Sequence, residues 1–179
     1  MSLTPPDPFT DGVVVLRRLR EGDRAAVLET MRDPLVRQWL NMPLEPGDRD
    51  FASLLRTAEA GFRSGDRYDF CVVTNDDEPS RGAVIASRRA RDNYELAYLA
   101  GAAGRGEGLM TRAVTLLSRW LIAQGVGRLE IRTHPDNGAS QELAKRCGFR
   151  REGHERRSIW LHGRRQDALV WSLLPEDLR

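Results

Sequence analysis

Lysine is nearly absent from this chain of 179 residues, because Lys145 is the only lysine among 28 basic residues. The rest are arginines, and 26 acidic residues reduce the formal net charge to +2. A nucleic-acid-binding protein usually carries unopposed positive charge on one face. Here acids and arginines are interleaved, as in Arg151-Glu152-Gly153-His154-Glu155-Arg156. The composition therefore favours a solvated surface of mixed charge and argues against a nucleic-acid partner.

Cysteine, histidine and long apolar runs are also scarce. Cys71 and Cys147 are too few for a disulfide framework, which favours a reducing, cytoplasmic setting. The histidines show no ligand spacing with either cysteine, so we expect no metal site. No apolar run approaches about 18 residues, so no membrane partner is expected. The N-terminus lacks the basic and apolar regions of a secretion signal.

The length suits a single domain. Prolines in Met1-Ser2-Leu3-Thr4-Pro5-Pro6-Asp7-Pro8 indicate a flexible lead-in over residues 1–11, followed by one domain over residues 12–179. Apolar periodicity and turn residues predict the order β-α-α-β-β-β-α-β-α-β-β. This order favours an α+β domain with a mixed, mostly antiparallel sheet and helices on both faces. The expected strands are 13–16, 68–74, 82–87, 94–100, 129–133, about 149–159, and 169–173.

A strand, a glycine-rich turn and a helix follow one another between residues 94 and 124. The first N–H groups of a helix lack intrahelical partners and lie at the positive end of its dipole, so such a turn can bind phosphate. Gly106 and Gly108 let an anion approach the backbone, and Arg105 can add a charge-assisted hydrogen bond. A surface loop that uses glycine for its turn geometry is an equal alternative. The spacing matches neither the dinucleotide-binding fingerprint nor the nucleotide P-loop.

Three motifs together carry a resemblance to a known family. Arg105-Gly106-Glu107-Gly108-Leu109-Met110 resembles the [Q/R]-x-x-G-x-[G/A] motif of the GNAT N-acetyltransferases. Pro135-Asp136-Asn137-Gly138-Ala139-Ser140 and Gly148-Phe149-Arg150-Arg151-Glu152-Gly153 are similar to the N-x-x-S and G-F-x-x-E-G patterns of the RimJ/RimL-like, ribosomal-protein-alanine acetyltransferase branch. The resemblance covers nearly the whole chain from Val13 onward. Met110 departs from the family motif, where many members have Gly or Ala.

The resemblance implies an acetyl-CoA-dependent N-acyltransferase. It would move an acetyl group to a primary amine, on a protein N-terminus or a small molecule, by direct attack in a ternary complex. The sheet would be splayed where acetyl-CoA binds, and the Leu99 N–H would donate to the thioester carbonyl. The implied partners are acetyl-CoA as cosubstrate and an amine acceptor, and a homodimer stays open. The residues implied to bind acetyl-CoA are Ala97, Tyr98, Leu99, Arg105, Gly106, Glu107, Gly108, Leu109, Met110 and Asn137.

Two residues are the catalytic candidates. Ser140 matches the serine of the branch and is the candidate acid for the thiolate, with a backbone-bonded serine of the first helical turn as the alternative. Glu95 is the candidate general base and would act through water, since four strand residues separate it from Leu99 by roughly 13 Å. A structural carboxylate paired with an arginine is its alternative. His134 or ordered water could replace it as the base.

One departure from the family concerns the chemistry. Ala144 stands where many members have a tyrosine that protonates the thiolate. This departure leaves a non-catalytic acyl-CoA-binding module as the alternative function. Asn137 either binds the pantetheine arm or caps its helix, or does both. Cys147 and Asp167 are expected to be structural.

The acceptor is expected between the loop of residues 40–50 and the hairpin near His162. Four apolar side chains are candidates for a wall there, with burial in the core as the more common role of such residues. They are Trp39, Met42, Phe51 and Trp160.

Overall fold

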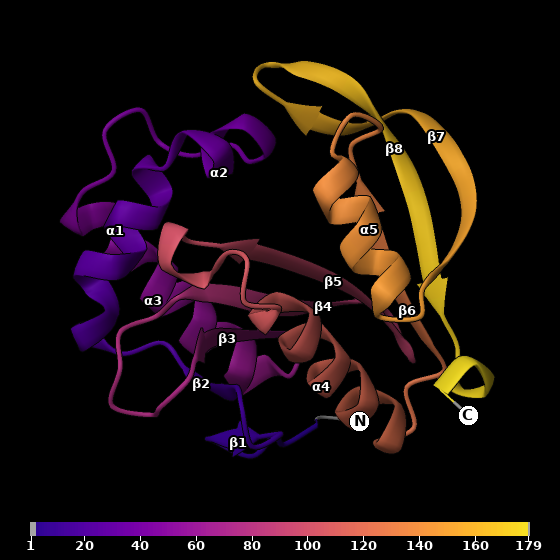
Figure 1. Cartoon of the computed structure of the whole chain (residues 1–179), viewed down its shortest axis with the longest axis horizontal. Helices are drawn as coiled ribbons and strands as arrows, with labels where there is room; N and C mark the ends of the chain where they lie inside the picture. The colour runs from indigo at the N-terminus through magenta and orange to yellow at the C-terminus, as the bar shows by residue number, and fades with distance from the viewer. Residues whose placement is uncertain (1–2, 179) are drawn as a thin grey trace.

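Alternating apolar residues build one eight-stranded sheet in the computed structural model, which describes residues 3–178 (Figure 1). The strand order is β1-β2-β3-β4-β5-β6-β8-β7, and among the described strands β5 and β6 form the one parallel pair. The strands are β1 (Phe9–Thr10), β2 (Val15–Arg18), β3 (Arg67–Val73), β4 (Gly82–Ala90), β5 (Asn93–Ala100), β6 (Arg128–Thr133), β7 (Arg150–Leu161) and β8 (Arg164–Leu173). The expected α+β class with a mixed, mostly antiparallel sheet is confirmed.

Within residues 3–178, five α-helices accompany the sheet, and three short 3-10 turns lie between or after the larger elements. The helix α4 packs on one face against β3, β4 and β5, while α1 and α3 lie on the other side (Figure 1). No helix within residues 3–178 is both long enough and apolar enough to cross a membrane. The helices are α1 (Arg24–Arg32), α2 (Pro34–Trp39), α3 (Asp48–Ser64), α4 (Leu109–Ala123) and α5 (Gly138–Arg146).

The N-terminal segment differs from the predicted lead-in. Leu3 is only 7% exposed, and its N–H and C=O both bond the Tyr68 hydroxyl, at 3.1 and 2.9 Å. Phe9 and Thr10 form β1, which pairs with β2. The prolines do interrupt regular structure, but the apolar side chains of Leu3 and Phe9 on either side of them are stabilised by burial against the sheet. Residues 1, 2 and 179 of the predicted boundaries lie outside the described residues.

Pro34 separates the first two helices, as its sequence position predicts. It occupies the first turn of α2, where the missing N–H costs nothing. The carboxylate of Asp33 caps this turn by accepting from the N–H groups of Leu35 and Val36, at 2.8 and 3.3 Å. The chain therefore turns sharply between α1 and α2, and α2 lies over the end of β5 (Figure 1).

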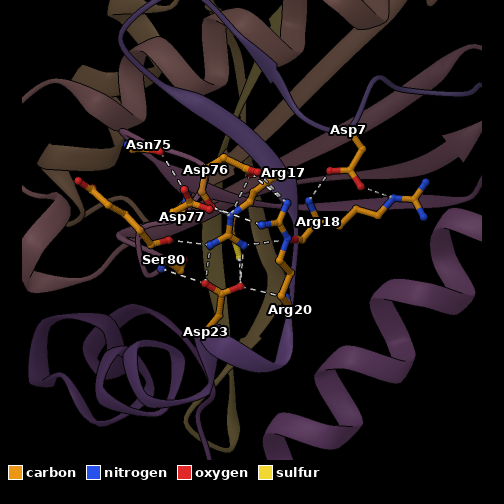
Figure 2. A network of polar contacts seen from close by, with 11 residues as sticks. Asp7, Arg17, Arg18, Arg20, Asp23, Asn75, Asp76, Asp77 and Ser80 are labelled. Carbon is orange, nitrogen blue, oxygen red and sulfur yellow. Dashed lines mark hydrogen bonds and ion pairs between the residues drawn. The ribbon is translucent and has the colours of Figure 1, made fainter.

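A buried ion pair fastens α1 to the sheet (Figure 2). The guanidinium of Arg17 on β2 donates to both carboxylate oxygens of Asp23, at 2.7 and 2.8 Å. It also donates to the carbonyls of Asp76 and Glu78 in the β3–β4 turn, at 3.0 and 2.7 Å. Burial by itself raises the pKa of Asp23, but the hydrogen bonds from Arg17 and two backbone N–H groups lower it overall. One arginine thus joins β2, the start of α1 and the β3–β4 turn.

Candidate active site

The strands β5 and β6 separate part of the way along their length. They pair at three positions, which end at Glu95 opposite Glu130. Beyond that point β5 continues to Ala100, paired with β4 on its other edge, while β6 continues to Thr133, paired with β8. The two strands therefore diverge (Figure 1). A slot opens between the β5 and β6 halves of the sheet. Residues of β5 after Glu95 present backbone groups to this slot that no neighbouring strand occupies.

A cavity of about 380 Å³ occupies the slot. The helices α2 and α5 form its sides, and the first turn of α4 contributes Met110. The structure brings together seven of the predicted site residues in its lining, but not Glu95 or residues 106–109. These seven are Ala97, Tyr98, Leu99, Arg105, Met110, Asn137 and Ser140. Trp39 of α2 was a predicted wall residue, but Leu35 and Val36 were not predicted, since nothing local to them indicates that they face β5.

The glycine-rich turn leads directly into α4. Gly108 precedes the first helical residue with φ of +73°, and Gly106 has φ of +81°, both in the left-handed region that favours glycine. No atom lies within 4 Å of the position that a Cβ would take at either glycine. In the described part of the chain, the N–H groups of residues 106–108 have no backbone partner. The turn therefore has the free donors and the open space that a pyrophosphate needs.

Arg105 has an additional structural role that its motif does not indicate. Its guanidinium contacts the carboxylate of Asp33 at 2.8 Å and donates to the carbonyl of Ala100 at 3.1 Å. The hydrogen bond from Arg105 is also the main reason that the pKa of Asp33 is lowered. This ion pair joins the glycine-rich turn before α4 to the cap of α2. Arg105 also lies within the lining of the slot.

Ser140 and Tyr98 face each other across the slot. The Tyr98 hydroxyl lies 2.9 Å from the Ser140 hydroxyl and 2.9 Å from the Ser140 carbonyl. Burial raises the pKa of Tyr98 to about 12, so the phenol carries its proton at neutral pH. Asn137 caps α5 by accepting from the Ser140 N–H at 3.1 Å, which confirms its predicted cap. The pair places two hydroxyl groups between β5 and α5.

Ala144 lies one helical turn after Ser140 and is completely buried in the core. The position where many GNAT members carry a tyrosine is thus packed here by a methyl group. The hydroxyl groups that line the cavity on this side come instead from Tyr98 and Ser140. The sequence indicated Tyr98 only as a residue implied to bind acetyl-CoA, because a separation of 42 positions conceals its proximity to Ser140.

Glu95 lies where β5 and β6 begin to diverge, but it is engaged by two arginines. Its Oε2 atom accepts from Arg89 and from Arg132, each at 2.5 Å. Arg132 in turn contacts Glu130 and Glu155, at 3.1 and 3.2 Å. This arrangement favours the arginine-paired alternative for Glu95 over the general base. His134, the other candidate, lines the cavity and packs against Trp39 with ring centroids 5.2 Å apart.

The remaining candidates fall into separate environments. Trp39 lines the slot and Met42 lines a second cavity, but Phe51 is 1% exposed in the core and Trp160 is 58% exposed. The prediction that these four residues form a single apolar wall is therefore wrong.

Asp167 bonds His154 and the Arg157 N–H, which is a structural role. Among residues 3–178, no group of three or more potential ligands is arranged to hold a metal ion.

Comparison with known proteins identifies a family that matches most of the chain. Residues 14–150 match the family model described as the acetyltransferase (GNAT) domain. The Bacillus subtilis (strain 168) protein named "Probable N-acetyltransferase YjcK" is 28% identical over 116 residues, which cover 63% of this chain and 64% of that protein. The ribosomal protein uS5 alanine N-acetyltransferase of Escherichia coli (strain K12) is 26% identical over 119 residues, covering 64% of this chain and 61% of that protein. The chain thus spans somewhat less than two thirds of these curated relatives.

The fold is also similar to solved structures. Mycobacterium smegmatis RimJ in complex with CoA-disulfide superimposes with a TM-score of 0.82 at 23% identity, over 93% of this chain and 84% of that one. At this identity the likeness shows a shared fold. The overall fold of this chain is therefore shared with that protein.

Proposed function

Since this chain belongs to the GNAT acetyltransferase domain family, we propose that it transfers an acetyl group from acetyl-CoA to a primary amine. The observation that carries the proposal is the slot between β5 and β6, which opens beside the free N–H groups before α4. An extended pantetheine arm can pair with the unpaired edge of β5 as an added strand would. The pyrophosphate then meets the positive end of α4.

In the proposed donor site, each residue predicted to bind acetyl-CoA contacts one part of that molecule. The backbone of residues 105–110 holds the pyrophosphate, and the backbone of residues 97–99 holds the pantetheine arm. The register with β4 directs the Leu99 N–H toward Ala83, so the N–H groups that face the slot are those of Tyr98 and Ala100. These groups, rather than the predicted Leu99 N–H, can donate to the thioester carbonyl, where negative charge develops during attack by the amine. Asn137 caps α5 with its Oδ1 atom and retains its amide nitrogen for the arm.

Direct attack by the amine is favoured over an acetyl-cysteine intermediate. Burial raises the pKa of the Cys71 thiol to about 12 and that of Cys147 to about 11. Both thiols are therefore protonated and weakly nucleophilic at neutral pH. Neither cysteine lines the cavity between β5 and β6. A ternary complex of protein, acetyl-CoA and amine follows from this absence of an activated nucleophile in that cavity.

The Tyr98–Ser140 pair supports a route for the proton that the departing thiolate needs. The phenol has one proton, which it can donate either to the Ser140 carbonyl or to the Ser140 hydroxyl. Only the second arrangement directs the serine proton away from Tyr98 and into the slot. We assign Ser140 as the acid and Tyr98 as the residue that positions its hydroxyl. We assign Glu95 the role of anchoring Arg132, with an ordered water as the base.

The first experiment measures CoA release with acetyl-CoA and a panel of primary amines. The panel contains peptides with free N-termini, among them N-terminal alanine because of the uS5 relative, together with aminoglycosides and polyamines. We expect turnover with at least one class, accompanied by an acetylated product in mass spectrometry. Tight acetyl-CoA binding without turnover on any acceptor would instead establish the acyl-CoA-binding module.

The Ser140→Ala variant is expected to lower kcat by about 100-fold with little change in KM for acetyl-CoA, because a positioned acid contributes about 10²–10⁴-fold. Glu95→Gln is expected to retain kcat within about tenfold, because we assign it no proton transfer. Ser53→Ala, an exposed serine on α3, is the matched control. Steady-state kinetics of the three variants decide between these roles. A larger loss of kcat in Glu95→Gln than in Ser140→Ala would reverse the assignment.

A further inference from the structure

A second cavity, of about 320 Å³, lies on the sheet face that α1 and α3 cover. It adjoins the slot, because Leu40 and Leu99 line both cavities. Its size is at the lower end of the range for small-molecule pockets, about 300–1,000 Å³. Its lining comes from α1, α3, β3, β4, β5 and the loop of residues 40–42, and it includes Val27, Met31, Leu54, Ile85 and Leu99.

The register of the sheet places this cavity next to the proposed thioester position. Cys71 pairs with Ala83, and Ala83 pairs with Leu99, so the three residues cross β3, β4 and β5 in one row. Neighbouring strands lie about 4.8 Å apart, so the floor of the cavity extends about 10 Å from Leu99. A group that begins at Leu99 can therefore reach across the floor to β3.

The charges in the second cavity are already balanced. Asp69 is the one carboxylate among the described residues of its lining, and it is 6% exposed. Both of its oxygens accept from Arg67, each at 2.7 Å. The thiol of Cys71, in the same row as Leu99, is protonated at neutral pH because burial raises its pKa to about 12. A second ammonium group that entered this cavity would find no unpaired carboxylate.

The surface that the cavity offers is aliphatic. Val27 and Met31 of α1, Leu54 of α3 and Ile85 of β4 point into it and are only partly buried. These aliphatic side chains surround an open volume and still expose apolar surface to water. Contact with an apolar group removes this surface from water, which lowers the free energy. The ion pairs of Arg132 with Glu95 and Glu130 lie outside this lining, so they do not alter the preference of the cavity for an apolar group.

We propose that the second cavity binds an apolar group of the acceptor while the acceptor amine lies at Leu99. The inference rests on the proposed function and narrows it to monoamines that carry an aliphatic or aromatic group close to the amine, such as a hydrophobic N-terminal residue. Polyamines and aminoglycosides, which carry several positive charges, are disfavoured. Specificity then depends on the side chains of α1, α3 and β4 that shape the cavity.

The test changes the size of the cavity at Ile85, which faces the lining from the middle of β4. The probes are spermidine and tripeptides with free N-termini that begin with glycine, leucine or phenylalanine. Binding to the CoA-loaded protein is measured by calorimetry, and acetyl transfer by CoA release. We expect the unmodified protein to bind the leucine peptide at least tenfold more tightly than spermidine or the glycine peptide. Ile85→Ala should raise the preference for phenylalanine over leucine about tenfold, and Ile85→Trp should weaken binding of both peptides about tenfold.

Ile122→Ala, on α4 and outside both cavities, is the matched control and should leave the preferences unchanged. Acetyl-CoA affinity, measured on every variant, shows that the donor site and the fold are intact. Tighter binding of spermidine, or peptide preferences that do not respond to Ile85, would overturn the inference while leaving the acetyltransferase function in place. Peptide binding that responds to Ile85 without acetyl transfer would support the cavity and count against the proposed function.

Discussion

Gly108→Asp is expected to weaken acetyl-CoA binding about 100-fold relative to Gly108→Asn. Both variants place a side chain of the same shape at φ of +73°, with no atom within 4 Å of the new Cβ, so they share the cost of the left-handed backbone. They differ in one negative charge at the N-terminus of α4, next to the proposed pyrophosphate. Like charges that meet across an interface cost several kcal/mol, and a factor of 100 corresponds to about 2.8 kcal/mol.

Calorimetry with acetyl-CoA measures this difference, and thermal unfolding of both variants checks that the fold is retained. The asparagine variant is the control for backbone strain. Equal affinities of the two variants would contradict the placement of the pyrophosphate at this turn. A lower affinity of the asparagine variant than of the unmodified protein would measure the separate contribution of the backbone conformation.

Asp23→Ala is expected to lower the free energy of unfolding by about 3–5 kcal/mol, because it leaves the buried Arg17 guanidinium without its counter-charge. The Arg17 and Asp23 side chains are 3% and 1% exposed, so water does not replace the lost bonds (Figure 2). The N–H groups of Arg20 and Ser80 lose their acceptor in the same variant. Urea denaturation measures the change, since the midpoint and slope give the free energy of unfolding.

Two comparisons separate the buried charge from other effects of the substitution. Asp48→Ala removes a carboxylate that pairs with Arg24 at the surface, where the two side chains are 76% and 54% exposed, and should cost less than about 1 kcal/mol. The double variant Arg17→Met with Asp23→Leu should recover part of the stability that Asp23→Ala loses, because it removes both buried charges. A loss in Asp23→Ala no greater than that in Asp48→Ala would refute the role of the pair.

Local signals in the sequence predicted the elements that carry the donor site. The turn at Gly106 and Gly108, the cap at Asn137 and the break at Pro34 each depend on residues within a few positions of one another. Such features follow from backbone conformation and from hydrogen bonds within one turn, which the neighbouring residues determine. The family motifs extended the prediction from single turns to the whole fold, because they record which local features occur together in one fold.

Contacts between distant segments changed the interpretation of several residues. Leu3 bonds Tyr68 across 65 positions, which places the N-terminal segment against the sheet. Glu95 lies 37 positions from Arg132, and their contact favours an ion pair where the sequence suggested a base. Each of these contacts depends on how the strands are ordered in the sheet. Strand order is a property of the whole chain, so a local pattern cannot supply it.

The sequence by itself determined the class of fold, the family and the glycine-rich turn before α4, because periodicity, turn residues and short motifs are local. The tertiary structure alone decided that β5 and β6 diverge after Glu95, that Tyr98 meets Ser140 across the slot, and that a charge-balanced aliphatic cavity adjoins Leu99. The physical reason is that these features arise between elements. Their geometry depends on the packing of α1, α2 and α5 around the sheet, to which residues along the whole chain contribute.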